Sequence, residues 1–450
     1  MRNEDDNETQ ASRRAFFKNT AALAAATGVG LTASAAAQAR ANDSAIGRKQ
    51  ANETVEPFWG MHQGGIATPQ QQHVYFAAFD LTTAKRSDVA ALLKAWTSAA
   101  ARMSRGATAE PMDAGLQTAA SSPESAAYSP PAPSGQAADS GEALDMGPHR
   151  LTVTFGFGPG LFSKEGHDRY GLAARRPEPL VDLPRFPGDQ LVEAHTGGDL
   201  CIQACADDPQ VAFHCVRQLA RIASGIATVR WVQAGFLPNV PPHQTARNLM
   251  GFKDGIVNPA IDDPREMERF VWVGTEGPTW MRGGSYLVAR RIRIALEHWD
   301  QMKVAFQEQT VGRHKLSGAP LGRKHESDSL DLEAKDKDGN PIIPENSHVR
   351  LSSAAANGGA MILRRGYSYN DGVNLTAERW PPWREGMEYD AGLLFLAYQK
   401  DPRSGFILIF DKVARFDMMN QFVTHVGSGL FACPGGAMPG EYVGQRLFEA

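Results

Sequence analysis

The alternation of apolar and polar residues predicts strands and helices in a repeating order through the first half of the chain. The run His73–Leu81 is β-branched, aromatic and apolar, which is typical of a strand. Apolar residues then recur at helical spacing over 87–105, a helix that Ser87 or Asp88 can cap. Further strands are predicted at 151–155, 199–204 and 227–236, and a helix opened by Asp208-Pro209 runs to about 224. Strands and helices in this order describe a ferredoxin-like unit.

The second half follows a similar plan. Strands are predicted at 270–274, 285–294, 393–399 and 430–432, and helices at 295–309 and 406–423. Residues 310–347 are charged and loop-like. The fold class expected is therefore α+β, with two tandem ferredoxin-like domains, each an antiparallel sheet with helices. This expectation rests on the order of the elements, because the two halves share no sequence repeat.

The N-terminus has the layout of an export signal. Paired arginines at Arg13 and Arg14 precede Phe16, and an Ala-rich stretch then leads to a small-x-small cleavage site at 37–39. The pattern resembles a twin-arginine signal, which exports folded proteins. It predicts a signal peptide over 1–39, the twin-arginine translocase as a partner during export, and a periplasmic or secreted protein. A disordered basic tail is the alternative.

The remaining chain divides into a leader, two domains and one insertion. Residues 40–55 are polar and predict a flexible leader. Residues 106–147 are rich in Ala, Ser, Pro and Gly, and nearly lack large apolar side chains. Such a segment buries too little surface to offset its ordering entropy, so it predicts a flexible insertion. It interrupts an N-terminal domain over 56–240, which a C-terminal domain over 241–450 follows.

Composition excludes several classes of protein. The 450 residues carry a net charge of −4 with no basic stripe, which argues against a nucleic-acid partner. No uncharged apolar run of 18 residues predicts a membrane span. The four cysteines lack zinc spacing, and no Cys-x-x-Cys-His attaches a haem covalently. Cys201 and Cys205 lie too far apart along one strand to bridge, so buried free thiols are expected.

Three segments contain the side chains that a haem requires to cleave a peroxide. Gly251-Phe252-Lys253-Asp254-Gly255 is a turn sequence that can hold a carboxylate over a cavity. His348 follows a polar loop, and axial imidazoles hold haem iron in peroxidases. The Leu-Arg-Arg-Gly-Tyr block at 363–367 adds guanidinium groups. Taken alone, the first segment also suits a surface turn, and the histidine also suits a core or surface position.

Together, in this order, these segments resemble the dye-decolorising peroxidases, and in particular their exported deferrochelatase/peroxidase (EfeB-like) subgroup. The similarity covers almost the whole mature chain except 106–147. The stretches that carry it are 64–70, 152–158, 197–200, 206–210, 248–255, 348–351, 363–369 and 392–395. The resemblance implies a pair of ferredoxin-like domains, with one haem b per chain in the C-terminal half.

The resemblance also implies a role for each matching residue. His348 is the axial iron ligand, while Asp254 and Arg364 lie on the distal side as the catalytic pair. The backbone of Gly255, Ile256 and Val257 lines the haem, and Arg365 is structural. Chemistry agrees, because a carboxylate can move a proton between the two peroxide oxygens. A guanidinium stabilises the negative charge that develops as the O–O bond breaks.

Two contacts of the haem site are left open by the sequence. The His-x-Arg-Leu block continues as Ser352-Ser353-Ala354-Ala355, where related sequences tend to have Ala-Asn-Pro-Arg. The arginine that meets a haem propionate is missing, and Arg290, Arg291 or Arg350 are candidates to replace it. The axial histidine also needs an acceptor for its second nitrogen, and Asp390 is a candidate.

The expected function is reduction of hydrogen peroxide with oxidation of dyes or other bulky organic donors. One alternative is a deferrochelatase, which releases iron from haem and leaves the porphyrin intact. Another is a non-catalytic haem carrier, which would need no polar distal pair. The resemblance also allows an iron-uptake system and a second copy of the chain, as a homodimer, as partners.

Overall fold

A computed structural model describes residues 53–111, 138–241, 244–377 and 385–449. The strands are β1 (His73–Leu81), β2 (Thr152–Phe157), β3 (Leu200–Ala206), β4 (Ala227–Phe236), β5 (Ser285–Ile294), β6 (Leu363–Arg364), β7 (Tyr367–Ala377), β8 (Glu385–Gln399) and β9 (Val423–Cys433). The helices are α3 (Arg86–Met103), α5 (Pro159–Phe162), α6 (Pro209–Ile222), α7 (Pro264–Phe270), α8 (Leu296–Asp300), α9 (Val304–Val311), α10 (His348–Ser352), α11 (Leu408–Phe416) and α12 (Gln445–Phe448).

All the strands belong to one antiparallel sheet that closes on itself like a barrel. Its order is β5-β9-β2-β3-β1-β4-β7-β8-β6, and β5 also pairs with β8. The expected α+β architecture of antiparallel strands and helices is confirmed, and the strands of both halves join in one sheet instead of lying in two separate ones. The two halves meet at two seams, where Phe157 pairs with Ala432 and Phe236 pairs with Ser368. Sequence patterns could not reveal this joining, because each seam rests on a single pair of residues far apart in the chain.

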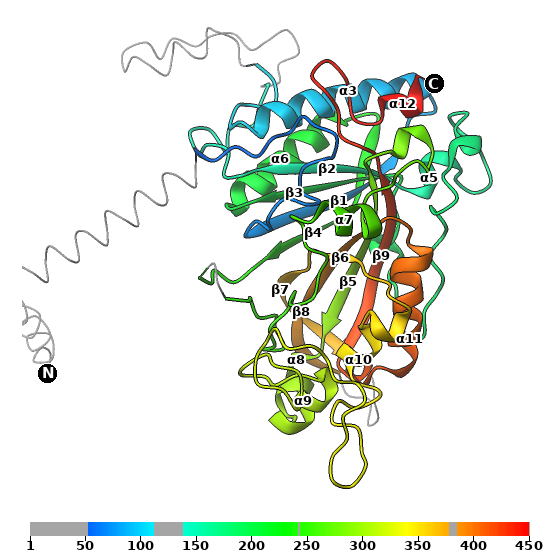
Figure 1. Ribbon diagram of the computed structural model, residues 1–450. Helices are drawn as coiled ribbons and strands as arrows, with labels where there is room; N and C mark the ends of the chain where they lie inside the picture. The colour runs from blue at the N-terminus through cyan, green and yellow to red at the C-terminus, as the bar shows by residue number, and fades with distance from the viewer. Residues whose placement is uncertain (1–52, 112–137, 242–243, 378–384, 450) are drawn as a thin grey trace, which may run out of the picture. The chain divides into compact units, whose positions relative to one another are not determined.

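The N-terminal half of the barrel is covered by α3 and α6 (Figure 1). Trp96 of α3 is fully buried, packs against Phe79 and Phe155, and donates its indole hydrogen bond to the Leu219 carbonyl. Asp208 caps α6 as expected, accepting bonds from two backbone N–H groups. The cap expected for α3 is wrong, since the N-cap residue is Lys85 and makes no side-chain cap bond.

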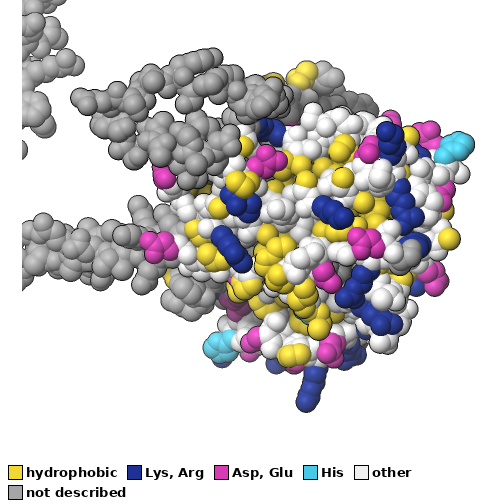
Figure 2. Space-filling view, turned by 90° about the horizontal axis from the view of Figure 1, so that it is seen from above, with side chains coloured by type: hydrophobic (Ala, Val, Ile, Leu, Met, Phe, Trp, Pro, Cys, Tyr) yellow, Lys and Arg dark blue, Asp and Glu magenta, His cyan; other side chains and the backbone are white. Residues whose placement is uncertain are grey.

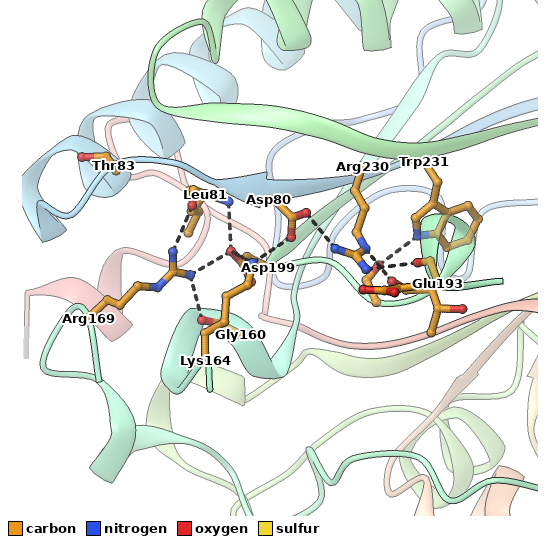
Figure 3. Close-up of polar contacts among 12 residues, drawn as sticks. Asp80, Leu81, Thr83, Gly160, Lys164, Arg169, Glu193, Asp199, Arg230 and Trp231 are labelled. Atoms are coloured by element: carbon orange, nitrogen blue, oxygen red, sulfur yellow. Dashed lines mark hydrogen bonds and ion pairs between the residues drawn. The ribbon is translucent and has the colours of Figure 1, made fainter. Parts of the chain in front are cut away.

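A buried carboxylate fixes the long connection between β2 and β3 (Figure 3). Asp199 is 2% exposed and accepts bonds from the Lys164 and Arg169 side chains and from the Leu81 amide. Gly160 is required beside it, because a Cβ there would lie 1.9 Å from the Asp199 carboxylate. The connection anchored in this way also delivers Asp189 to the buried Arg290 of β5.

Elements of the C-terminal half are shorter than the sequence predicts. The helix expected over 295–309 is broken into α8 and α9, and that expected over 406–423 is regular only in α11. The strand expected at 270–274 does not form, because Phe270 ends α7 and a loop follows. β7 was missed, although its residues alternate, because the Asp371-Gly372 step interrupts the pattern where the register shifts. α10 and α11 lie against the β5–β9 part of the barrel (Figure 1).

The predicted flexible insertion is only partly described. Residues 112–137 lie outside the described residues, as do the predicted signal peptide and most of the leader. Residues 138–147 are not a free segment, because Asp139 is 6% exposed and accepts a bond from the Ala109 amide, and Gln210 of α6 donates to the Glu142 carbonyl. Composition misled here, since a few polar side chains suffice to anchor a segment that has almost no apolar ones.

Within the described ranges, no helix is long and apolar enough to cross a membrane. The face in Figure 2 shows lysine, arginine and acidic side chains interspersed with apolar ones. All four cysteines are free and buried, as predicted for Cys201 and Cys205.

Candidate active site

The Gly251–Gly255 segment forms a turn that presents Asp254. Gly251 and Gly255 have φ values of 84° and 83°, a region that residues with a Cβ rarely adopt. The side chain of Asn248 accepts bonds from the Met250 and Phe252 amides and so closes the turn. Asp254 Oδ1 accepts a 2.7 Å bond from the Gly255 amide, which leaves its side chain about one-third exposed.

Asp254 lies beside Arg364, as the resemblance implied. Arg364 Nη1 is 3.6 Å from Asp254 Oδ1, and its Nη2 donates to the Val257 carbonyl at 2.8 Å. Asn258 bonds both the amide and the carbonyl of Arg364. Sequence reasoning missed Asn258, although it lies only four residues after Asp254. The turn therefore positions the acid and, through its next residues, the arginine.

The neighbours of this pair differ in their exposure. Val257 is 55% exposed and Gly255 is exposed, while Ile256 is half-buried, so these residues are available to line a ligand. Arg365 is only 3% exposed and donates to the Thr68 carbonyl and to Gln71 Oε1. The two adjacent arginines therefore bond different parts of the chain, and Arg365 makes structural contacts.

His348 is the first residue of α10 and is oriented by a buried carboxylate. Its Nδ1 lies 2.6 Å from Asp417 Oδ2, and Asp417 is 4% exposed. Asp417 in turn accepts a bond from the Met419 amide, which fixes the carboxylate just after α11. Asp390, the candidate acceptor from the sequence, instead pairs with Arg291 and Asn374. The 69 residues between His348 and Asp417 hid this pair from sequence reasoning.

Electrostatic interactions connect all three predicted side chains. Burial alone would lower the pKa of His348, but the charge of Asp417 and its hydrogen bond raise it overall. Arg364 lowers the same pKa and Asp254 raises it, each through its charge. The charges of the distal pair therefore bear on the protonation of His348.

The donor set fits an iron-bound cofactor. Because Nδ1 of His348 faces a carboxylate, the imidazole takes the tautomer that leaves the Nε2 lone pair for a metal. Half-buried apolar side chains, Leu351 and Phe395, pack nearby against the core. The three arginines considered for propionates all have protein partners. Arg290 pairs with Asp189, Arg291 with Asp371 and Asp390, and Arg350 bonds the Ile343 and Leu332 carbonyls.

Known proteins resemble this chain over nearly its whole length. The chain is 36% identical to the dye-decolorizing peroxidase of Thermobifida fusca, with 99% of each chain covered. It is 33% identical to the deferrochelatase of Shigella flexneri, with 100% of each covered. Among solved structures, ferric DtpA from Streptomyces lividans superposes with a TM-score of 0.76 at 40% identity, covering 89% of this chain and 98% of the other.

Two family descriptions divide the chain close to the boundary that the sequence suggested. "Dyp-type peroxidase, N-terminal" matches residues 63–237, and "Dyp-type peroxidase, C-terminal" matches residues 245–438. The second match contains the turn of Asp254, His348 and Arg364. With matches over most of its length and full-length relatives above 30% identity, the chain belongs to the Dyp-type peroxidase family.

Proposed function

We propose that this Dyp-type peroxidase binds one haem b between His348 and the Asp254–Arg364 pair, and reduces hydrogen peroxide at the expense of bulky organic donors. One observation carries the proposal. A histidine with a buried carboxylate on its Nδ1 is electrostatically coupled to an acid and an arginine that contact each other. Solved relatives that include a ferric form and a haem complex support the choice of cofactor.

The haem supplies the iron centre at which the peroxide O–O bond is cleaved and the oxidising equivalents are held. Asp254 moves the peroxide proton. Its Oδ1 is engaged by the Gly255 amide and lies near Arg364, so Oδ2 is the atom that takes and returns the proton. Arg364 keeps a permanent positive charge beside the separating oxygens, and its bond to the Val257 carbonyl holds that charge in place.

Asp417 is a positioning residue for His348. By accepting the Nδ1 proton it fixes the ring orientation and makes Nε2 a stronger donor to iron. Its own position is fixed by the hydrogen bond that it accepts from the Met419 amide. The Asn248 amide at 3.5 Å from Asp254 Oδ2 is a weaker contact, so the acid stays free to exchange a proton.

A second function, release of iron from haem, is favoured by one observation. Full-length relatives at 33% identity carry the name deferrochelatase. The distal pair argues against a plain haem carrier, which requires no acid and arginine beside the iron. One experiment distinguishes all three functions in haem-loaded protein mixed with peroxide and a bulky dye. The products measured are oxidised dye, free iron and metal-free porphyrin.

The expected result is rapid dye oxidation without stoichiometric release of iron. Release of equimolar iron and intact porphyrin, with no dye turnover, would show that the protein acts as a deferrochelatase and not as a peroxidase. A haem spectrum unchanged by peroxide, with no product of either kind, would leave only a carrier. Asp254→Asn protein serves as the control for uncatalysed dye oxidation by free haem.

We also infer two ferredoxin-like units in the barrel. Each half contributes four strands with the same spatial order, β2-β3-β1-β4 and β7-β8-β5-β9, and each order is crossed by helical connections. This supports the two-domain division at about residue 240. The described residues at the seams then join the units into one closed sheet.

Export by the twin-arginine pathway to the periplasm or the exterior is proposed on the sequence pattern at Arg13 and Arg14. An iron-uptake system and a homodimer are proposed partners on the resemblance alone. Export is tested by replacing both arginines with lysine and measuring the protein in the periplasmic and cytoplasmic fractions. An unchanged distribution would exclude this route.

A further inference from the structure

Asn258 joins the turn that carries Asp254 to the strand that carries Arg364. Its side chain donates a 2.9 Å hydrogen bond to the Arg364 carbonyl and accepts a 3.1 Å bond from the Arg364 amide. The two residues lie 106 positions apart in the chain. A single side-chain amide therefore bonds both polar groups of one backbone residue, as a neighbouring strand would.

The pairing of β6 shows why Arg364 needs such a partner. Among the described strands, β6 pairs only with β8, and Arg364 lies opposite Ala397. The Arg365 amide donates to the Leu396 carbonyl at 2.7 Å, so the next pair along is a hydrogen-bonded one. Because hydrogen-bonded and non-hydrogen-bonded pairs alternate in an antiparallel ladder, the amide and carbonyl of Arg364 point away from β8. They lie on the free edge of β6, where the Asn258 side chain bonds them.

The chain around Asn258 restricts the movement of its side chain. Pro259 follows it and is buried, and a residue before proline is biased towards extended conformations. Val257 precedes it, and the Val257 carbonyl accepts the 2.8 Å bond from Arg364 Nη2. The same short segment thus bonds the backbone and the guanidinium of Arg364, and Asp254 lies only four residues earlier. The acid and the arginine are therefore held by one segment.

We propose that Asn258 is a positioning residue for Arg364, which sets the place of the guanidinium charge by substituting for a strand beside β6. The inference rests on the proposed function, in which Arg364 acts on the distal side of the haem. Asn258 acts through Arg364 and takes no part in the proton transfer. Loss of its amide leaves the edge of β6 unpaired, so the strand and its guanidinium shift relative to Asp254. Stabilisation of the developing charge falls with such a shift, because it depends on distance and direction.

Hydrogen exchange resolved to single residues tests the contact in the resting, haem-loaded protein, without peroxide. We expect Asn258→Ala to speed exchange of the Arg364 amide by about tenfold, because that amide loses its acceptor. The Arg365 amide, bonded to the Leu396 carbonyl, is the internal control and keeps its parent rate. Asn340→Ala, at an exposed position, is the matched control and changes neither amide. Equal exchange of the Arg364 amide in the parent and in Asn258→Ala overturns the proposal.

Stopped-flow absorbance after mixing with peroxide supplies the second readout, in the parent, Asn258→Ala, Arg364→Leu and the double variant. We expect Asn258→Ala to retain haem and to slow the reaction about 10–100-fold. In the Arg364→Leu background the same change should alter the rate by less than about twofold, since Asn258 acts through Arg364. A general loss of structure would slow both backgrounds alike, so equal slowing in both overturns the proposal.

Failure of this inference is distinguishable from failure of the proposed function. If Arg364→Leu slows the reaction and Asn258→Ala does not, only the role of Asn258 is overturned. If Arg364→Leu itself keeps the parent rate, the distal assignment fails, and the role of Asn258 fails with it. Should Asn258→Ala not fold, Asn258→Ser replaces it in both backgrounds, because its shorter side chain withdraws the partner from the edge of β6. The same outcomes then decide.

Discussion

The two halves of the barrel share a strand order but differ in the helices that cover them. In the N-terminal half, α3 has 18 residues and α6 has 14. In the C-terminal half, α8, α9, α10 and α11 have 5, 8, 5 and 9 residues. The N-terminal half of the sheet is therefore covered by continuous helices and the C-terminal half by interrupted ones.

The difference explains where the chemistry lies. A long amphipathic helix covers its sheet with a continuous apolar face, and large rings such as Trp96 fill the space between. Short helices expose many ends, and polar side chains gather at these ends. His348 begins α10, and Asp417 immediately follows α11. We conclude that the C-terminal half has a less continuous apolar cover, and that its helix ends hold polar side chains in fixed orientations. The following variants test this contrast.

The largest effect is expected at the axial ligand. His348→Ala removes the only nitrogen that Asp417 orients, so the purified protein should contain little haem and show no peroxidase turnover. Haem content by absorbance and folding by circular dichroism check this outcome. His325→Ala, an exposed histidine, is the control and should match the parent. If the His348→Ala protein still contains haem and is active, the axial ligand is a different residue.

The distal pair should affect rate and not haem content. Asp254→Asn removes the proton carrier, with an expected loss of about 10²–10⁴-fold in turnover. Arg364→Leu removes a fixed charge, with an expected loss of about 10²–10³-fold. Stopped-flow absorbance after mixing with peroxide measures both. Asp262→Asn, an exposed acid near the same turn, should be neutral. If the double variant reacts with peroxide at the parent rate, Asp254 and Arg364 do not face the bound peroxide.

In the N-terminal half, stability should fall while the chemistry persists. Trp96→Ala leaves a cavity and removes the indole hydrogen bond to the Leu219 carbonyl, at an expected cost of about 3–5 kcal/mol in the free energy of unfolding. Denaturant titration measures this loss. Ser98→Ala, exposed on the same helix, should change it little. Turnover per bound haem should stay near the parent value, and a large drop would show that the two halves are not separable.

A moderate effect is expected at Asp417, the carboxylate that orients His348. Asp417→Asn keeps the shape but removes the charge that orients His348, so haem affinity or turnover should fall about 10–100-fold. The haem absorbance spectrum should shift as well, which a purely structural role would not produce. Asp411→Asn, at a half-exposed position of α11, is the matched control. An unchanged spectrum and rate would remove Asp417 from the site.

The smallest effect expected is the pH dependence of the stability with which the 138–147 segment packs. Burial would raise the pKa of Glu142, but the Ser140 hydrogen bond, a backbone bond and His214 lower it to about 2. A depressed pKa stabilises the folded state above the ordinary carboxyl pKa. This contribution is lost as the pH falls from about 4.5 towards 2. Hydrogen exchange at 138–147 should therefore accelerate over that range, and less so in Glu142→Gln. Equal pH profiles of hydrogen exchange in the parent and in Glu142→Gln would contradict a stabilising role for the Glu142 carboxylate.

Much of the strand pattern followed from local sequence. β1, β4 and β5 begin and end where the apolar runs predicted, because each strand has enough β-branched and aromatic residues to mark its limits. The C-terminal helices were predicted too long, since apolar spacing alone cannot show where tertiary contacts interrupt a helix. The motif residues Asp254, His348 and Arg364 could be named from the resemblance, but the contacts that hold them, from Asn258 and Asp417, could not.

By itself, the sequence determined the family, the candidate acid, arginine and histidine, and most of the strands. These depend on residues close together in the chain, where motif and periodicity act. Only the tertiary structure decided that one sheet closes through two single-pair seams, that Asp417 and not Asp390 orients His348, and that the 138–147 segment meets His214. Each of these depends on residues far apart in the chain, whose pairing is selected by packing and by the need to satisfy buried polar groups.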